Sequence, residues 1–187
     1  SLTTLFRSLK FAYDDGCPCN EGTCITAASF NKLEVLKYLN ENGCILSVPA
    51  SIEAAKNGNL EMIKYLHENG CPWDAHTCAE AASFGSLEML KYLHENGCPW
   101  DDETTEFASE FNNIECLKYA HENRCPIYDK IFLDSLKNKN FEIFKYATEN
   151  NFPFDNGLVI MGFITELTNE VLVYGNFDFA KCLIENG

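Results

Sequence analysis

The sequence predicts an all-α protein, built as a right-handed solenoid of about six helix–turn–helix units. The segment LEMIKYLHENGCPWD at residues 60–74 returns 27 residues later as LEMLKYLHENGCPWD at residues 87–101. A fixed period of roughly 20 to 50 residues is typical of stacked repeat units. The same 27-residue spacing separates a set of loop positions, occupied by Cys17, Cys44, Cys71, Cys98, Cys125 and Phe152.

The second helix of each unit is the most regular element. In the clearest copy, apolar residues recur every three or four positions at Leu87, Leu90 and Leu93, as along an apolar stripe of a helix. An N-cap side chain is expected directly before it, and that position holds Asn59, Ser86, Asn113, Asn140 and Asn176. The expected second helices lie near residues 33–42, 60–69, 87–96, 114–123 and 141–150.

The second helix should end at a left-handed residue. In the clearest copy this is Gly97, and Pro99 then prevents the helix from continuing. Arg124 and Asn151 replace the glycine in two later copies. Asn tolerates the left-handed conformation, whereas Arg should cost more.

A shorter first helix is expected before each second helix, at residues 76–84 in the clearest copy. Its pair Ala81–Ala82 would let a neighbouring helix approach closely, and Gly85 would form the turn to the second helix. Pro49 suits the first turn of its helix, with Ser47 as the expected cap. The expected first helices lie near residues 22–30, 49–57, 76–84, 103–111 and 130–138.

Residues 1–187 are expected to form one array, whose loops open at residues 17, 44, 71, 98, 125 and 152. Residues 5–15 fit the second helix of an earlier unit. The regularity fails after residue 152, and we assign the extra length to an insertion at about 156–165 in a divergent C-terminal repeat. Its apolar run, residues 158–164, either packs across the end of the stack or contacts a partner or missing segment.

The pattern Ala-Ala-x-x-Gly-x-Leu-Glu-x-x-Lys-x-Leu-x-Glu-Asn-Gly resembles the second half of an ankyrin repeat. An ordinary ankyrin repeat has about 33 residues and opens with a β-turn finger and Thr-Pro-Leu-His, which this 27-residue repeat lacks. The 27-residue repeat of this sequence is similar to the shortened ankyrin-like repeats of giant DNA viruses of amoebae and of some protists. The resemblance implies an ankyrin-like solenoid with shortened or absent β-hairpin fingers. The residues that carry it are Ala81, Ala82, Gly85, Leu87, Glu88, Lys91, Leu93, Glu95, Asn96 and Gly97.

Composition and motifs exclude several classes of function. The formal net charge of −14 at pH 7 opposes binding to nucleic acid and to anionic membranes. No stretch of about 18 apolar residues predicts a transmembrane helix. The sequence has no glycine-rich phosphate loop, no nucleophile elbow and no His-Glu-x-x-His motif. We therefore expect no enzymatic activity and no cofactor.

The ten cysteines suggest disulfides or metal sites, but their spacing argues against both. Stacked helices lie about 8–10 Å apart, whereas a disulfide needs Cα atoms within about 7 Å, so the repeated cysteines should be buried free thiols. Cys17 and Cys19 with Cys24 have no second Cys/His pair at zinc-finger spacing, and the one-per-unit histidines His67, His94 and His121 are too far apart to share a metal. Free thiols indicate a reducing intracellular compartment, which for a viral protein is the host cytoplasm.

The predicted function is that of a scaffold or adaptor that binds a protein through the concave face of the solenoid. The first helices and the loops before them should form this face. They differ between units, which is also what unconstrained surface would show. Adjacent acidic residues favour a partner with a basic patch, and we expect a monomer. The candidate partner-binding residues are Glu80, Glu103, Glu106, Glu110, Trp73, Trp100, Phe84 and Phe111.

Alternatives remain open for the aromatic residues and for the function. Trp73 and Trp100 could instead cap the core beneath their loops, and Phe30, Phe84 and Phe111 could pack in the core. We expect both ends of the chain to continue in a longer protein, so the array could be the substrate-recognition part of a larger adaptor or enzyme. A cysteine-based redox or metal-binding protein is the remaining alternative.

Overall fold

The computed structural model describes residues 20–153, and this part of the chain contains ten helices and no strand. The predicted all-helical array is confirmed for these residues. The expected helix at 5–15, the loop at Cys17, the cap at Asn176 and the insertion at about 156–165 lie outside them. The helix pairs are α2 (Glu21–Ser29) with α3 (Leu33–Glu41), α4 (Val48–Lys56) with α5 (Leu60–Glu68), α6 (Ala75–Phe84) with α7 (Leu87–Glu95), α8 (Asp102–Glu110) with α9 (Ile114–Glu122), and α10 (Ile131–Lys137) with α11 (Phe141–Glu149).

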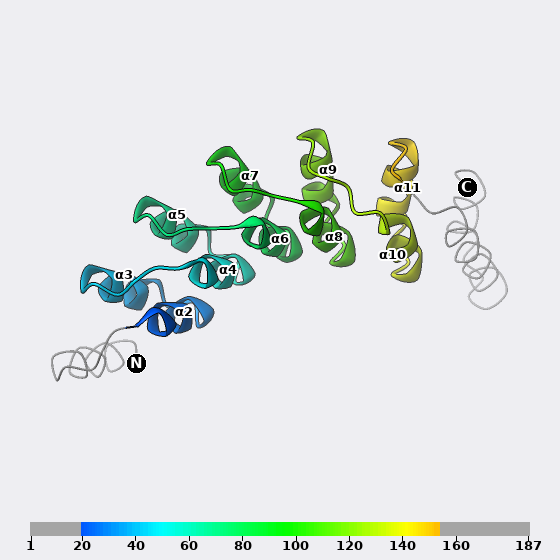
Figure 1. Ribbon diagram of the computed structural model, residues 1–187. Coiled ribbons are helices and arrows are strands. Elements are labelled where there is room, and N and C mark those ends of the chain that lie inside the picture. Colours follow the sequence, from blue (N-terminus) through cyan, green and yellow to red (C-terminus); the bar gives the residue numbers. More distant parts are fainter. Residues whose placement is uncertain (1–19, 154–187) are drawn as a thin grey trace.

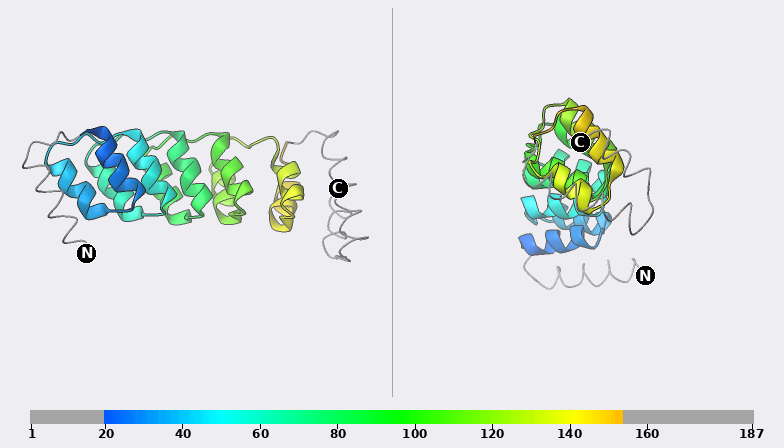
Figure 2. Two further views of the ribbon diagram at one scale, coloured as in Figure 1. Left: turned by 90° about the horizontal axis from the view of Figure 1, so that it is seen from below. Right: turned by 90° about the vertical axis from the view of Figure 1, so that its right-hand side faces the viewer.

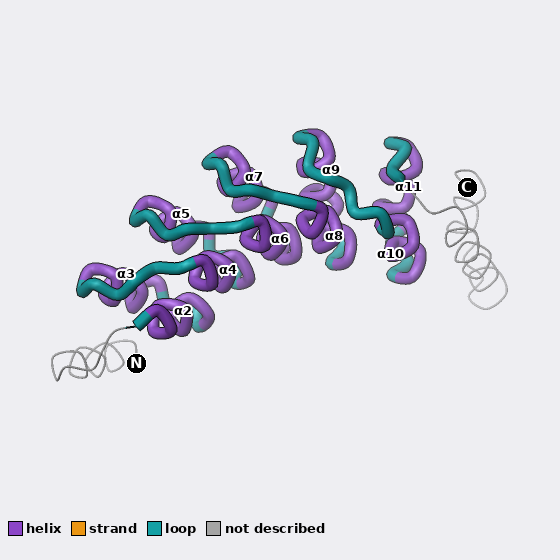
Figure 3. The backbone as a smooth tube through the Cα atoms, in the orientation of Figure 1, coloured by secondary structure: helices purple, strands orange, loops and turns teal. Residues whose placement is uncertain are grey.

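The five pairs stack into a curved array (Figure 1). The first helix of each pair lies on the inner side of the curve, so α2, α4, α6, α8 and α10 are the inner helices and the odd-numbered helices are the outer helices. Each inner helix contacts the next along the stack. Figure 2 shows the elongated outline of the array, and Figure 3 shows the loops that lead from each outer helix to the next inner helix.

The expected difference in length between the two helices of a unit is wrong for most units. The inner helices α2, α4 and α8 have nine residues, as do the outer helices, and only α10, with seven residues, is shorter. The reason is that both helices of a unit end in the same way, with a left-handed residue shortly after the last turn.

A residue with positive φ follows every described helix. It allows the next N–H groups to turn back to the last helical carbonyls, as in the hydrogen bonds from Gly97 N to His94 O and from Cys98 N to Leu93 O, both 3.0 Å. The left-handed conformations expected after the outer helices are confirmed. The inner helices are followed by Asn31, Gly58, Gly85, Asn112 and Lys139, and the outer helices by Gly43, Gly70, Gly97, Arg124 and Asn151.

The predicted N-caps are only partly confirmed. The side chains of Asn59, Ser86 and Asn140 each accept a hydrogen bond from the backbone N–H three residues later. The prediction is wrong for Asn113, whose amide instead donates to two carbonyls in the last turn of α6, at 2.8 and 2.7 Å. It is also wrong for Ser47, whose hydroxyl makes no cap hydrogen bond. At Asn113, contact with the preceding unit has replaced the local cap.

The core between the two rows of helices is built from side chains of unequal size. Inner helices contribute mainly alanines, whereas outer helices contribute longer aliphatic side chains. Small side chains let the inner helices approach more closely than the outer ones, which curves the stack toward the inner row. Fully buried examples are Ala54, Ala55, Ala81, Ala82 and Ala108 in the inner row, and Met62, Leu66, Met89, Leu93 and Leu117 in the outer row.

Cys71, Cys98 and Cys125 are buried free thiols, as predicted. Each donates to the backbone carbonyl directly before the inner helix of its own unit, at S···O distances of 3.3, 3.3 and 3.1 Å. The prediction is wrong for Cys44, which is disulfide-bonded. The other six described cysteines are free. The free thiol that helix spacing predicts at every repeated cysteine is therefore not formed at Cys44.

The left-handed stops predict a matched pair of stability changes. Arg124 is exposed and has φ 65°, a conformation that costs an L-residue about 1 kcal/mol. Arg124→Gly should therefore raise the free energy of unfolding by up to about 1 kcal/mol. Gly97→Arg should lower it by a similar amount, because Gly97 has φ 82° and open space where a Cβ would stand. Urea denaturation followed by circular dichroism measures both, and a loss of stability in Arg124→Gly would contradict the argument.

Candidate partner-binding site

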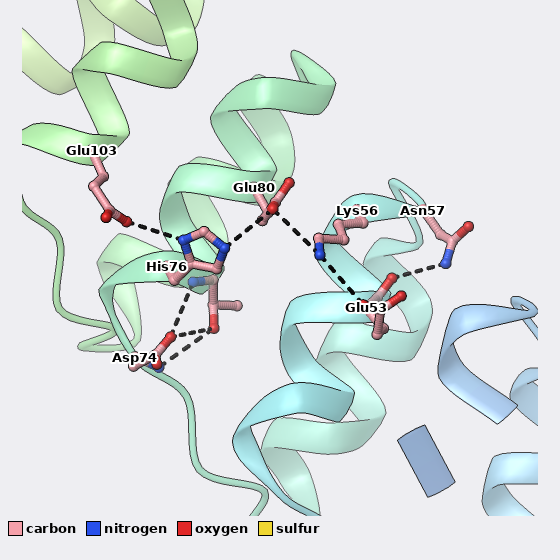
Figure 4. Close-up of polar contacts among 8 residues, drawn as sticks. Glu53, Lys56, Asn57, Asp74, His76, Glu80 and Glu103 are labelled. Carbon is pink, nitrogen blue, oxygen red and sulfur yellow. Dashed lines mark hydrogen bonds and ion pairs between the residues drawn. The ribbon is translucent and has the colours of Figure 1, made fainter. Parts of the chain in front are cut away.

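Polar side chains of the inner helices α4, α6 and α8 form a chain of ionic contacts (Figure 4). Lys56 Nζ lies 3.4 Å from Glu53 Oε1 and 3.6 Å from Glu80 Oε1. His76 lies between two carboxylates, with Nε2 3.3 Å from Glu80 and Nδ1 3.0 Å from Glu103. Because these side chains come from three successive units, their contacts link the units across the surface of the array.

A capping box at the start of α6 holds His76 in position. The Asp74 carboxylate accepts a hydrogen bond from Thr77 N at 3.3 Å, and Asp74 N donates to the Thr77 hydroxyl at 3.4 Å. The two contacts satisfy backbone groups that the helix leaves free. They define where the first turn of α6 begins, and His76 projects from that turn toward α8 (Figure 4).

The Glu80 carboxylate has little access to solvent. Its side chain is 12% exposed and lies between Lys56 and His76. The Glu80 carboxylate is thus already paired with a lysine and contacted by a histidine of its own chain. Glu80 therefore links units, whereas Glu103, with a side chain 48% exposed, remains accessible beside His76.

Negative charge accumulates around Glu106 on α8. Burial raises the pKa of the Glu106 carboxyl, and the charges of Glu110, Glu103 and Asp134 raise it further, while a hydrogen bond from the Tyr128 hydroxyl lowers it. In turn, burial and the Glu106 carboxylate raise the pKa of Tyr128 to about 12. The inner side of α8 and the loop before α10 thus form one acidic surface.

Three of the exposed aromatic residues lie at the C-terminal ends of inner helices. Phe30, Phe84 and Phe111 are 68%, 55% and 53% exposed. The alternative that these rings pack in the core is therefore wrong. Each lies at the turn between the inner and the outer helix, where the chain leaves the inner row and large side chains reach solvent.

Trp73 and Trp100 contact outer helices. Trp73 stacks on His67 with ring centroids 4.0 Å apart, and Trp100 stacks on His94 at 3.8 Å. Both indoles are partly buried against the core, which favours the alternative that they cap it. None of their described ring contacts involves the four acidic candidates, so the structure groups the tryptophans with the core and the glutamates with the inner face.

Phe107 and Tyr128 belong to this surface but were not among the sequence candidates. The Phe107 ring lies 5.7 Å from the His76 ring and 6.1 Å from the Phe111 ring. A signal was present in the sequence, because Phe107 occupies the position that carries a carboxylate in the neighbouring units, at Glu80 and Asp134. Tyr128 was not recognisable, since its contact with Glu106 depends on how the loop before α10 folds back on α8.

Two further properties concern residues 20–153. No group of three or more His, Cys, Asp or Glu side chains in this range is arranged to hold a metal ion. None of the helices in the same range is long and apolar enough to cross a membrane.

Comparison with known proteins agrees with the fold. Residues 24–104 match the family model described as "Ankyrin repeats (3 copies)". The crystal structure of the human ASB11 ankyrin repeat domain is similar to this chain, with a TM-score of 0.65 and 16% sequence identity, over 88% of this chain and 83% of that one. The described fold is an ankyrin-like solenoid. No curated protein matches the sequence. An origin among the shortened repeats of giant DNA viruses stays a prediction.

The raised pKa of Glu106 predicts a pH-dependent gain of stability on its removal. Because the pKa of this carboxyl is higher in the folded state, the free energy of unfolding falls as pH rises through that pKa. Well below the ordinary pKa of 4.5, the carboxyl is protonated in both states and this cost is absent. Glu106→Gln, which can still accept the Tyr128 hydrogen bond, should therefore stabilise the protein at pH 7 but not near pH 3. Urea denaturation at both pH values measures this, with Glu88→Gln on exposed α7 surface as control. An equal effect at both pH values would contradict the assignment.

Proposed function

We propose that this chain is a protein-binding module that holds a partner protein against the exposed side of α4, α6, α8 and α10. Ankyrin repeats are generally protein–protein interaction modules, and a solenoid of this kind presents an extended concave surface. The site within the array, the chemistry of the partner and a non-enzymatic role are part of the proposal.

The main support is the contrast between the two rows of helices. The outer helices α5 and α7 have nearly the same sequence, LEMIKYLHE and LEMLKYLHE. The matching inner helices α4 and α6 read VPASIEAAK and AHTCAEAASF, and share little beyond the buried alanines. Repeats that keep the packing residues and vary the exposed residues of one face are well suited to recognising a partner on that face.

The charge of the surface favours a basic partner. Glu103, Glu106 and Glu110 lie close enough for their charges to interact, and the whole chain carries a formal charge of −14. Such a surface repels nucleic acid and anionic membranes and speeds the approach of positively charged proteins. We propose a monomeric protein inside the cell, in the host cytoplasm if the repeats are of viral origin.

An alternative is that the array is the substrate-recognition part of a larger adaptor or enzyme. The same surface would then hold the substrate, and the complete reading frame would distinguish this role from independent scaffolding. A cysteine-based redox or metal-binding function has less support. Six of the seven described cysteines are free and buried.

Charge reversal on the inner face tests the proposal. The partner is captured with the wild-type chain and identified, and its association rate is measured at two salt concentrations. Glu103→Lys with Glu110→Lys should slow association, and the slowing should be largest at low salt, because surface charges are screened beyond about 8 Å at physiological ionic strength.

The matched control is Glu88→Lys with Glu142→Lys, which makes the same change of charge at exposed first-turn positions of outer helices α7 and α11. The control should leave most of the association rate intact. A partner whose association is insensitive to salt, or is slowed equally by both double variants, would rule out the acidic inner face as the binding site.

A further inference from the structure

The exposed surface of α8 differs from that of the inner helices α4 and α10. In α4 and in α10, an acidic residue and a lysine three positions later form an ion pair, so these helices neutralise their own carboxylate. At the equivalent positions α8 carries Phe107 and Glu110. At these two positions α8 thus has an aromatic ring and a carboxylate, where α4 and α10 have a carboxylate and a lysine. The ion pairs of α4 and α10 are Glu53–Lys56 at 3.4 Å and Asp134–Lys137 at 3.3 Å.

As a result of this difference, two carboxylates and two aromatic rings lie together on α8. Glu106, Phe107, Glu110 and Phe111 follow one another at helical spacing, so they share one surface, named below the α8 face. The Phe107 and Phe111 rings lie 6.1 Å apart at 65°, and Phe111 is 53% exposed. Neither glutamate has a cationic partner within residues 20–153: Glu106 accepts from the neutral hydroxyl of Tyr128.

Two basic side chains in this region make other contacts. His76 contacts Glu80 and Glu103 and meets Phe107 edge-on. Lys130 Nζ lies over the Tyr128 ring, 5.8 Å from its centroid. The α8 face therefore offers negative charge beside exposed aromatic surface, and the chain itself does not neutralise it.

A guanidinium group matches this combination better than an ammonium group. It is planar, so it can stack on an aromatic ring, and it presents several N–H donors in a fork that suits carboxylates. An ammonium group is a more strongly hydrated point charge and gains less from the rings. We propose that the α8 face binds an arginine side chain of the partner protein, which stacks on Phe107 and donates to Glu106 and Glu110. This inference rests on the proposed function, since it names the residue type by which a basic partner engages the inner face.

Two otherwise identical Gly/Ser peptides, one with two arginines and one with two lysines, test the inference. Each is titrated into the ¹⁵N-labelled full chain and followed by NMR. The arginine peptide should shift the amide signals of residues 103–111 and bind about two- to fivefold more tightly than the lysine peptide, as expected for stacking worth about 0.5–1 kcal/mol.

Variants separate the contribution of the ring from that of the charge. Phe107→Leu keeps an apolar side chain, so both peptides should still bind while the preference for arginine disappears. Phe107→Glu with Glu110→Lys installs in α8 the ion pair of α4 and α10, and should abolish the shifts of both peptides at α8. Phe30→Leu, which removes an exposed ring from the end of α2, is the matched control and should preserve the preference.

The inference is overturned if both peptides bind the wild-type chain equally, if Phe107→Leu keeps the preference for arginine, or if neither peptide shifts the signals of α8. Equal binding of both peptides at α8 would still agree with a basic partner on the inner face. The proposed function has its own test in the charge reversals at Glu103 and Glu110, so the two can fail independently.

Discussion

A left-handed residue after every helix is the constraint on which the described array depends. It turns the chain back within a few residues, so that the following backbone N–H groups donate to carbonyls that the helix end leaves unpaired. Because this turn recurs twice in each 27-residue unit, both helices of a unit have similar length and successive units repeat the same path. The stack then brings equivalent faces of successive helices into contact. Alanines in the inner row and longer side chains in the outer row convert the stack into a curve.

Stacking also determines which charges interact. Residues 27 positions apart become neighbours, as His76 and Glu103 show with a distance of 3.0 Å. A carboxylate on an inner helix can therefore be neutralised within its own helix, as Glu53 is by Lys56, or from a neighbouring unit, as Glu80 is by the same lysine. On α8 neither mechanism supplies a cation to Glu106. The units of the array thus share one scaffold but differ in the ion pairing of their exposed carboxylates. A partner can be recognised by these differences.

Much of the fold could be predicted because its signals are local. Helix periodicity, capping residues and left-handed stops lie within one unit, and the described helices begin and end within one residue of the expected ranges. Predictions that depended on another unit were less reliable. Asn113 has the sequence of a cap but donates to α6, and Cys44 is disulfide-bonded although its position repeats that of free thiols. Of the site, the acidic residues were recognisable from charge, whereas Phe107 and Tyr128 depended on contacts between helices.

The sequence by itself determined the period, the helices, their stops and the buried side of each helix, since these follow from residue types at short and fixed spacing. Only the tertiary structure decided which exposed residues act together. Glu80 and Glu103 are both acidic residues of inner helices, yet one lies between Lys56 and His76 and the other is accessible. Trp73 was a partner-binding candidate from its loop register, with capping of the core as the alternative, and the structure stacks it on His67, partly buried against the core. The physical reason is that exposure and ion pairing depend on distances between units, which the stacking of helices sets and no single repeat encodes.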